Sequence, residues 1–166
     1  MAKNKATGFL NAKKQPLNDN ETISIFYKKQ CTYNPQMTQA EKIYKRGYVI
    51  RNKSDCYGDE KNFVQEDNGL RYPKRIQYFD NNFTREQLHP TQKPIELCRY
   101  IIRTYTNEND IILDNCCGSG SIPLSAKLEN RNYIGMDNGI CEKKNSKYDG
   151  WYWADVAQDR IENYIN

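Results

Sequence analysis

The sequence predicts an α/β fold whose C-terminal half contains a parallel βαβ unit. Three observations support this prediction. The apolar run 111–113 is short enough for a central strand, and a turn with two glycines, Gly118 and Gly120, follows it. A second short apolar stretch, 132–137, comes after a helical pattern. With 166 residues, the chain is long enough for one domain with a moderate core.

Helices are expected on both sides of this unit. The segment 93–106, KPIELCRYIIRTYT, has apolar residues at helical spacing, and Pro94 suits the first turn of a helix. Its apolar face comprises Ile95, Leu97, Cys98, Ile101, Ile102 and Tyr105. Free cysteine packs as a small hydrophobe, so Cys98 fits this face. Two further helices are predicted, a short one at 122–131 and an amphipathic one at 154–166.

The first half of the chain has weaker signals. The stretch 21–29, ETISIFYKK, alternates apolar and polar residues and predicts a strand, and 16–20, PLNDN, is typical of a turn before it. Residues 30–88 are polar and rich in turn formers, so only short elements are expected there, including a helical turn or two near 38–46. A stretch this long with little regular structure is usually functional or mobile.

Composition excludes several classes of protein. The N-terminus lacks a long apolar stretch, and no run in the chain is long enough to span a membrane. The chain has no C-x-x-C pair and its only histidine is His89, so we expect no metal site. We therefore expect a cytoplasmic protein whose six cysteines are reduced.

The net charge of +4 is unevenly distributed. Residues 1–53 carry eleven Lys/Arg against three Asp/Glu, whereas 54–166 carry fourteen against eighteen. A basic first third suggests a polyanionic partner, and nucleic acid is the obvious candidate. A solvated or partly disordered arm is the alternative explanation.

The glycine turn does not match two familiar phosphate-binding motifs. The dinucleotide fingerprint needs a third glycine at position 123, which is Pro123, and the P-loop sequence is absent. Gly118 and Gly120 still leave space for a ligand beside backbone amides at a helix N-terminus. Asp137 lies at the end of the next strand, where an acid can accept hydrogen bonds from both ribose hydroxyls. A ligand with a ribose and no pyrophosphate points to S-adenosylmethionine, and a tight βα turn with an incidental acid remains the alternative.

Three motifs in a fixed order carry a family resemblance. LHPTQKPIEL at 88–97, a helix, LDNCCGSGS at 113–121 and NYIGMD at 132–137 resemble the amino-group DNA methyltransferases of the permuted class, in which the cofactor half follows the catalytic half. The segment 3–37 is similar to the one that follows the catalytic strand in these enzymes. The resemblance is closest to the adenine-type members.

The resemblance implies a partial Rossmann-like, S-adenosylmethionine-dependent methyltransferase fold and a place in restriction–modification. The implied reaction moves a methyl group to the exocyclic amine of adenine in DNA. A cytosine amino-methyltransferase, or a non-catalytic remnant that binds DNA or cofactor, is the alternative.

The resemblance also implies roles for single residues. The implied cofactor-binding residues are Thr91, Lys93, Asp114, Cys116, Gly118, Gly120 and Asp137. Among them, Asp137 would hold the ribose, and Thr91 and Lys93 would lie near the methionine part. His89 would position its neighbours and would not act as an acid or base. On the residues alone, 88–97 could instead be a helix start with Thr91 as its cap. Asn115-Cys116 and Ser121-Ile122 depart from the usual Pro-Phe and Thr-Thr of the family loop.

One family motif is absent. These enzymes act through an Asp/Asn-Pro-Pro-Tyr/Phe motif that accepts hydrogen bonds from the target amine and stacks on the flipped base. The chain contains no Pro-Pro dipeptide, and YNPQ at 33–36 is the nearest imitation, without the second proline or the aromatic. We therefore expect the C-terminal part of such an enzyme, with no catalytic residue of its own, and a second chain that could carry the catalytic half.

The expected organisation is one partial methyltransferase domain with three segments. Residues 1–39 would be the remnant of the catalytic half, 40–87 the target-recognition stretch and 88–166 the cofactor-binding part. Double-stranded DNA is the expected partner. The candidates for phosphate contacts are Lys13, Lys14, Lys28, Lys29, Lys45 and Arg46.

Overall fold

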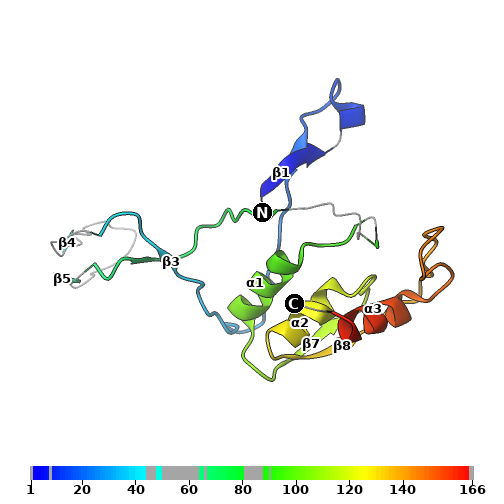
Figure 1. The fold of residues 1–166 in the computed structure, drawn as a ribbon. Helices are drawn as coiled ribbons and strands as arrows, with labels where there is room; N and C mark the ends of the chain where they lie inside the picture. Colours follow the sequence, from blue (N-terminus) through cyan, green and yellow to red (C-terminus); the bar gives the residue numbers. More distant parts are fainter. Residues whose placement is uncertain are drawn as a thin grey trace. The chain divides into compact units, whose positions relative to one another are not determined.

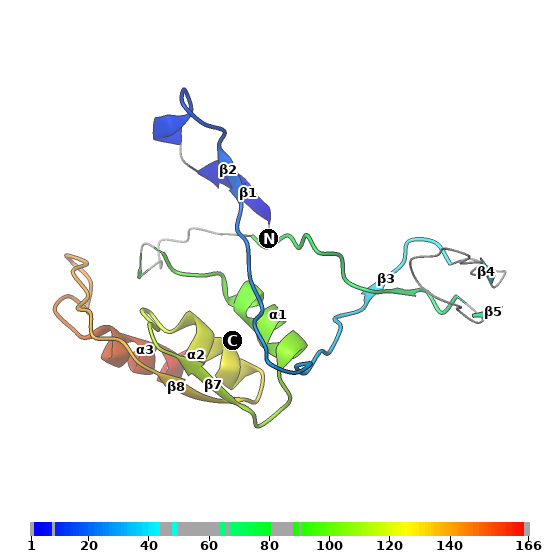
Figure 2. The same ribbon diagram turned by 180° about the vertical axis from the view of Figure 1, so that it is seen from behind.

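The computed structural model describes residues 2–7, 9–43, 48–49, 64–65, 67–80, 88–89 and 91–164. The chain divides into two units: the first combines Met1–Asn34 with Arg75–Asn166, and the second is Pro35–Lys74. Figure 1 and Figure 2 show the ribbon from opposite sides. The βαβ unit and the helices that pack on it lie in the first unit.

The predicted βαβ unit is confirmed. Strand β7 (Ile111–Asp114) and strand β8 (Asn132–Gly135) are parallel, and helix α2 (Ser121–Leu128) connects them. The register pairs Asp114 with Gly135, so the carboxyl ends of both strands meet at the same edge. Helix α2 packs on both strands, and Figure 1 shows it in yellow beside them. The described part of this unit is a partial Rossmann-like α/β fold.

Two further helices pack against α2, as the sequence predicts. Helix α1 (Ile95–Tyr105) begins after Pro94 and ends before Thr106, and helix α3 (Trp153–Glu162) follows the loop after β8. The buried residues of α1 are Leu97, Cys98, Ile102 and Thr104. Ile95, Ile101 and Tyr105, which were predicted on the same apolar face, are only half-buried.

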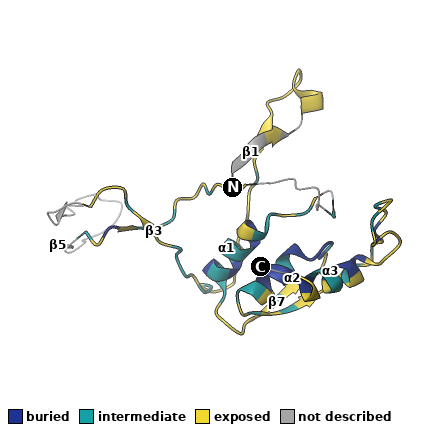
Figure 3. Cartoon of the chain, in the orientation of Figure 1, coloured by how far each residue is buried: buried dark blue, intermediate teal, exposed yellow. Residues whose placement is uncertain are grey.

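The core lies between these helices. Leu124 and Ala126 of α2 and Val156 of α3 are fully buried, as is Cys141 in the loop before α3. Figure 3 shows the buried positions concentrated on the three helices. Cys141 and Val156 form a cluster with Tyr148 and Trp153, and Leu88 packs against it. This cluster joins the loop after β8, α3 and the segment before α1.

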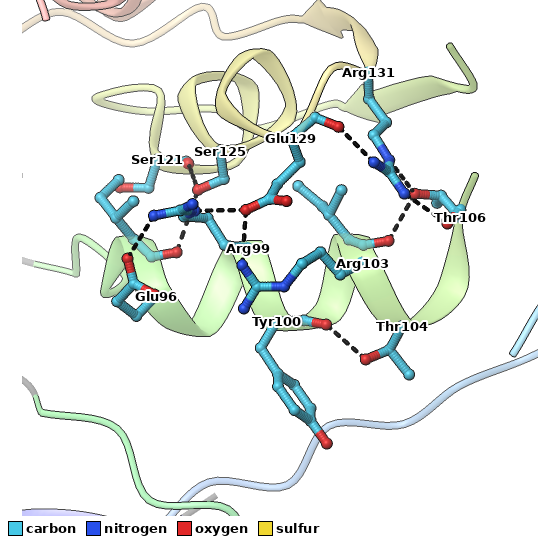
Figure 4. A network of polar contacts seen from close by, with 12 residues as sticks. Glu96, Arg99, Tyr100, Arg103, Thr104, Thr106, Ser121, Ser125, Glu129 and Arg131 are labelled. Carbon is cyan, nitrogen blue, oxygen red and sulfur yellow. Dashed lines mark hydrogen bonds and ion pairs between the residues drawn. The ribbon is translucent and has the colours of Figure 1, made fainter. Parts of the chain in front are cut away.

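A polar clamp fixes α1 on α2 (Figure 4). The Glu129 carboxylate accepts a hydrogen bond from Arg99 Nε at 2.6 Å and another from Arg103 Nη1 at 2.8 Å. Arg131 donates to the carbonyl oxygens of Glu129 and Thr106. Glu129 is largely buried, so its charge is compensated by two guanidinium groups in a partly dry environment. The clamp holds the end of α2 against the middle of α1.

One face of the strand pair is apolar and exposed. The exposed side chains are Ile111, Leu113, Ile134 and Met136. Parallel sheets normally have both faces covered. Among the residues that the structure describes, β7 and β8 pair only with each other.

The prediction for 16–29 is wrong. Strand β1 (Ala2–Thr7) pairs with β2 (Asn18–Asn20) in an antiparallel arrangement, with a 3₁₀ turn at Phe9–Asn11 between them. Strand β2 thus lies where a turn was predicted, and the described residues 21–29, where a strand was predicted, pair with no strand. Alternation of side chains shows only that a segment could line a sheet, and a strand also needs a neighbour to accept its backbone hydrogen bonds.

Among its described residues, the second unit contains two short antiparallel pairs. Strand β3 (Thr38–Gln39) pairs with β6 (Leu70–Arg71), and β4 (Tyr48–Val49) pairs with β5 (Val64–Gln65). The predicted helical turn near 38–46 is wrong where it can be compared, because 38–39 is extended and 41–42 is a bend. Positions 44–46 lie outside the described residues. The Arg71 guanidinium binds both carboxylate oxygens of Asp67, at 2.7 and 2.8 Å, next to this pairing.

Candidate cofactor site

The turn after β7 contains two glycines in the left-handed region. Gly118 has φ +49° and Gly120 has φ +78°, conformations that other residues adopt at a cost. A Cβ at Gly120 would lie 2.7 Å from the Cβ of Ala157, so this glycine lets the turn contact α3. A Cβ at Gly118 would come no closer than 3.7 Å, to the ring of His89. Gly120 is therefore a packing requirement, and Gly118 faces the segment before α1.

The Asp137 carboxylate holds this turn. Its Oδ2 accepts the Gly118 N–H at 2.8 Å, and its Oδ1 accepts the Gly139 N–H at 2.8 Å. The backbone adds a third tie, since Cys117 N–H donates to the carbonyl of Met136 at 3.0 Å. An ionised carboxylate offers about four acceptor positions. One backbone bond on each oxygen leaves acceptor capacity on both for a ligand with two neighbouring hydroxyls.

The segment before α1 reaches the same turn through His89. His89 Nδ1 accepts the Thr91 N–H at 3.2 Å and lies 3.0 Å from the Thr91 hydroxyl. The ring meets Trp153 edge to face, with centroids 4.7 Å apart. Thr91 is not the cap of α1, because Pro94 occupies the N-cap position and no side chain caps that end. The alternative explanation of this segment as a simple helix start is therefore wrong for Thr91.

Gln92 connects the segment directly to the glycine turn. Its Oε1 accepts the Ser119 hydroxyl at 2.9 Å and the Leu88 N–H at 3.1 Å. Lys93, the next residue, forms an ion pair with Glu21 at 3.0 Å, and both side chains are partly exposed. The adjacent residues Gln92 and Lys93 therefore bind different parts of the chain.

The donors and acceptors at this edge fit a ligand that has a carboxylate and a ribose. No side chain caps the N-terminus of α2, which begins directly after Gly120. This helix end has positive character and N–H groups that suit an anionic group. Asp114 is buried beside it and accepts the Cys116 N–H at 3.2 Å. Among the described residues, no cluster of His, Cys, Asp and Glu could hold a metal ion.

The sequence of the chain matches the family described as DNA methylase over residues 1–147. The chain belongs to this DNA methylase family. It is similar to the type II methyltransferase M2.MboI of Moraxella bovis, with 47% identity over 52 residues, which are 31% of this chain and 19% of that protein. It is also similar to the type II methyltransferase M.HpaI of Haemophilus parainfluenzae, with 36% identity over 84 residues, which are 47% and 27% of the two chains. The chain thus spans less than a third of either relative.

One solved structure of similar sequence is the M1.HpyAVI–SAM complex. It is 32% identical to this chain, and the similarity covers 55% of this chain and 42% of that one, with a TM-score of 0.40.

Most predicted cofactor residues of this DNA methylase chain lie around the glycine turn. Gly118 and Asp137 are hydrogen-bonded to each other, and Asp114 is bonded to Cys116. Thr91 is linked to the turn through the His89 ring. Lys93 differs, because its ammonium group is held by Glu21. The roles of these residues toward a cofactor stay predictions.

Two buried thiols of the chain, Cys98 and Cys117, have raised pKa values. Burial, together with the nearby Asp114 carboxylate, raises the pKa of the Cys117 thiol from its ordinary value of 9.0 to about 11. Burial likewise raises the pKa of Cys98 to about 11. Both are protonated at neutral pH, when a thiolate would be needed for nucleophilic attack. The prediction that Cys98 packs as a small hydrophobe is confirmed.

Asn34, in the nearest imitation of the base-binding motif, has a structural role. Its Nδ2 donates to the carbonyls of Arg103 at 3.3 Å and Thr106 at 3.0 Å, and its backbone N–H donates to the carbonyl of Thr104 at 2.7 Å. These carbonyls belong to the end of α1, where helix acceptors lack partners within the helix. The Asn34 amide therefore caps α1 from a distant part of the sequence.

The predicted phosphate contacts can be located only in part. Lys13, Lys14, Lys28 and Lys29 have exposed side chains, whereas Lys45 and Arg46 lie outside the described residues. None of the described helices has the length and apolar character needed to cross a membrane.

Sequence reasoning missed three residues at the site. Gln92 and Ser119 stood inside quoted motifs, but nothing in the sequence indicated that they would meet. Arg160 donates to the Ser119 carbonyl at 2.8 Å from the last turn of α3. A basic residue near a helix C-terminus is common enough that its position gave no signal.

Proposed function

We propose that this chain is the cofactor-binding part of a site-specific DNA amino-methyltransferase of the permuted class, and that its cofactor is S-adenosylmethionine. One observation carries the proposal: the Asp137 carboxylate, at the end of parallel strand β8, fixes Gly118 of the turn that ends β7. An acid and a glycine turn in this relation are suited to a ribose beside a helix N-terminus.

Each group at the site has a distinct proposed task. Asp137 accepts hydrogen bonds from the two ribose hydroxyls through the acceptor capacity that its backbone bonds leave. The uncapped N-terminus of α2 faces the carboxylate of the methionine part, with Thr91 and Lys93 near it. Gly118 allows the ligand to approach the backbone. When bound, S-adenosylmethionine supplies an electrophilic methyl group, and the protein contributes binding and alignment.

The proposed acceptor is the exocyclic amine of adenine, with cytosine as the alternative. This amine is a weak nucleophile that must be flipped out and held by hydrogen-bond acceptors. The chain has no Pro-Pro dipeptide, and its Asn34 amide is bonded to α1. The proposal therefore assigns the base-binding motif to further polypeptide, in the same protein or in a second chain. A non-catalytic remnant is the second candidate function, favoured by the same absence.

DNA contacts are assigned to the basic first third of the chain. The exposed lysines Lys13, Lys14, Lys28 and Lys29 are the described candidates. Their contacts to phosphates should make affinity fall steeply with salt, in proportion to the number of phosphates neutralised. The division into segments 1–39, 40–87 and 88–166 belongs to this proposal, with base recognition in 40–75.

Isothermal titration calorimetry with S-adenosylmethionine tests the cofactor assignment. Asp137→Ala should weaken binding by about 1–3 kcal/mol, because a ribose would lose its acceptors. Asp149→Ala is a matched control, since Asp149 is an exposed acid of the same region. Equal affinities of the wild type and Asp137→Ala would remove Asp137 from the site.

Transfer of a radiolabelled methyl group to DNA of mixed sequence tests the catalytic assignment. The purified chain alone should give no incorporation, and activity should appear when a polypeptide bearing the Asp-Pro-Pro-Tyr motif is added or fused before Met1. Incorporation by the chain alone, abolished by Asp137→Ala, would show that the catalytic residues lie in these 166 residues.

A further inference from the structure

We infer that Arg160 and Gln92 are positioning residues that hold the glycine turn in its ligand-binding geometry by acting on Ser119. The inference rests on the proposed function only for the identity of what the turn binds. Neither residue needs to contact the ligand. Gln92 would act on the Ser119 hydroxyl, and Arg160 would act on the Ser119 carbonyl.

Ser119 is the point where three segments meet. It lies between Gly118 and Gly120 and is 3% exposed. Its hydroxyl donates to Gln92 Oε1 at 2.9 Å, and Arg160 Nη1 donates to its carbonyl at 2.8 Å. The same Arg160 nitrogen lies 3.4 Å from the Ser119 hydroxyl oxygen, which can accept because its proton is given to Gln92.

Both partners of Ser119 are themselves fixed. Gln92 Oε1 also accepts the Leu88 N–H at 3.1 Å, so the amide is tied to the start of its own segment. Arg160 extends from α3, one turn after Ala157, whose Cβ is the contact that excludes a side chain at Gly120. The two positions share one face of the helix. The glycine turn is therefore held at Gly120 by packing and at Ser119 by hydrogen bonds.

The turn needs such support because of its own composition. Two glycines flanking one serine give the backbone wide conformational freedom, and fixing it costs entropy. The Gly118 N–H must point at Asp137, and the start of α2 must keep its N–H groups available. A charge-assisted hydrogen bond from a partly buried guanidinium is among the stronger ways to fix a carbonyl. The peptide that links Ser119 to Gly120 is held on its N–H side by the Cys117 carbonyl at 2.8 Å, and loss of Arg160 would remove the bond on its carbonyl side.

A simple packing role for Arg160 makes a different prediction. Lys127 of α2 donates to the carbonyl of Ile161 at 2.9 Å, so it also joins α2 to α3 with a cationic side chain. Its hydrogen bond goes to α3 and not to the glycine turn. If these cations only attach α3 to the core, then Arg160→Met and Lys127→Met should have the same consequences.

The experiment uses the full chain in four forms: wild type, Arg160→Met, Arg160→Lys and Lys127→Met. Calorimetric titration with S-adenosylmethionine and the thermal midpoint are measured for each. Arg160→Met should bind about tenfold more weakly than Lys127→Met at a similar midpoint, and Arg160→Lys should restore part of the affinity. Equal affinities of the two Met variants would overturn the inference.

A pair of variants tests whether the effect passes through Ser119. Gln92→Leu should also weaken the binding of S-adenosylmethionine. In the double variant Gln92→Leu/Arg160→Met, the affinity should fall by less than the product of the two single fold-changes, because both residues act on Ser119. If the two fold-changes in affinity simply multiply, the two residues do not act through Ser119 together.

Amide hydrogen exchange keeps the inference separate from the proposed function. In the absence of any ligand, the Gly118 and Gly120 amides should exchange faster in Arg160→Met than in Lys127→Met. If the wild type binds no S-adenosylmethionine but this exchange difference is present, the cofactor assignment fails and the positioning role stands. Unchanged exchange at both glycines would refute the positioning role whatever the ligand.

Discussion

Two regions of the first unit differ in how they hold their apolar residues. In 91–164 the apolar side chains of α1, α2 and α3 form a core, and several are fully inaccessible. In 9–34 no residue is buried, although Phe9, Leu10 and Phe26 are large apolar residues with 75%, 87% and 91% of their surface exposed. The helices of 91–164 bury their apolar residues against one another, whereas 9–34 buries none of its residues.

The difference shows in which region the proposed cofactor-binding residues lie. The glycine turn and Asp137 lie in the region with a core, and the bonds from Asp137 to Gly118 and from Ser119 to Gln92 are made within it. Exposed apolar residues in the other region, and the exposed face of β7 and β8, are surfaces that a soluble chain seldom leaves uncovered. Additional polypeptide that covers them is what the proposed function requires.

The largest expected effect tests the packing of the glycine turn against α3. Gly120→Ala should lower the free energy of unfolding by about 3 kcal/mol, because the new Cβ meets Ala157 and the backbone has positive φ. Gly150→Ala is the matched control: its φ is +82° but nothing lies within 4 Å, so about 1 kcal/mol is expected. Urea denaturation compares the two, and equal losses would show that α3 does not pack on the turn.

Alkaline pH should weaken the packed region next. Cys98 and Cys117 have a pKa near 9.0 when unfolded and about 11 when folded, so their contribution to stability is complete below pH 9 and is lost as pH rises toward 11. At pH 11, each thiol should have lost stabilisation on the order of 2 kcal/mol. Urea midpoints at several pH values should fall less in Cys98→Val than in Cys116→Ser, in which an exposed thiol is removed. Parallel curves for the two variants would contradict the assignment.

A smaller effect is expected where the two regions meet. Asn34→Ala removes the side-chain bonds to the end of α1 and should cost about 1 kcal/mol. Asn20→Ala, which loses only a local exposed bond to Asp19, should cost almost nothing. If both variants unfold at the same urea concentration as the wild type, Asn34 does not fasten 9–34 to α1.

The smallest effect is expected at Lys93. Its ion pair with Glu21 is partly exposed on both sides, and such pairs contribute little because water screens them. Lys93→Met should change the free energy of unfolding by less than about 0.5 kcal/mol. A large loss of unfolding free energy, measured by the same urea titration, would show that this ion pair anchors 9–34 to the segment before α1.

The elements that sequence predicted well are those whose signals are local. Pro94 and the spacing of Cys98 and Ile102 specify α1, and an apolar run followed by glycines specifies β7 and its turn. The strand expected at 21–29 failed because its pairing depends on residues far away in the sequence, and no local pattern reports whether they are present. The same holds for Gln92 and Arg160, which meet at Ser119 only after α1, the turn and α3 have packed. A local motif can also mislead, as Asn34 shows. Its Asn-Pro dipeptide imitates a catalytic motif, but its amide caps a helix.

The central claim is that the turn between β7 and α2, together with Asp137 and the segment before α1, binds S-adenosylmethionine. The most direct measurement is a two-dimensional NMR spectrum of the labelled full chain during titration with this compound, with adenosine monophosphate as the comparison ligand. We expect the largest amide shifts at Gly118, Gly120 and Gly139, with smaller shifts around Thr91 and none between positions 9 and 20. Shifts confined to other residues, or the same response to both compounds, would contradict the account.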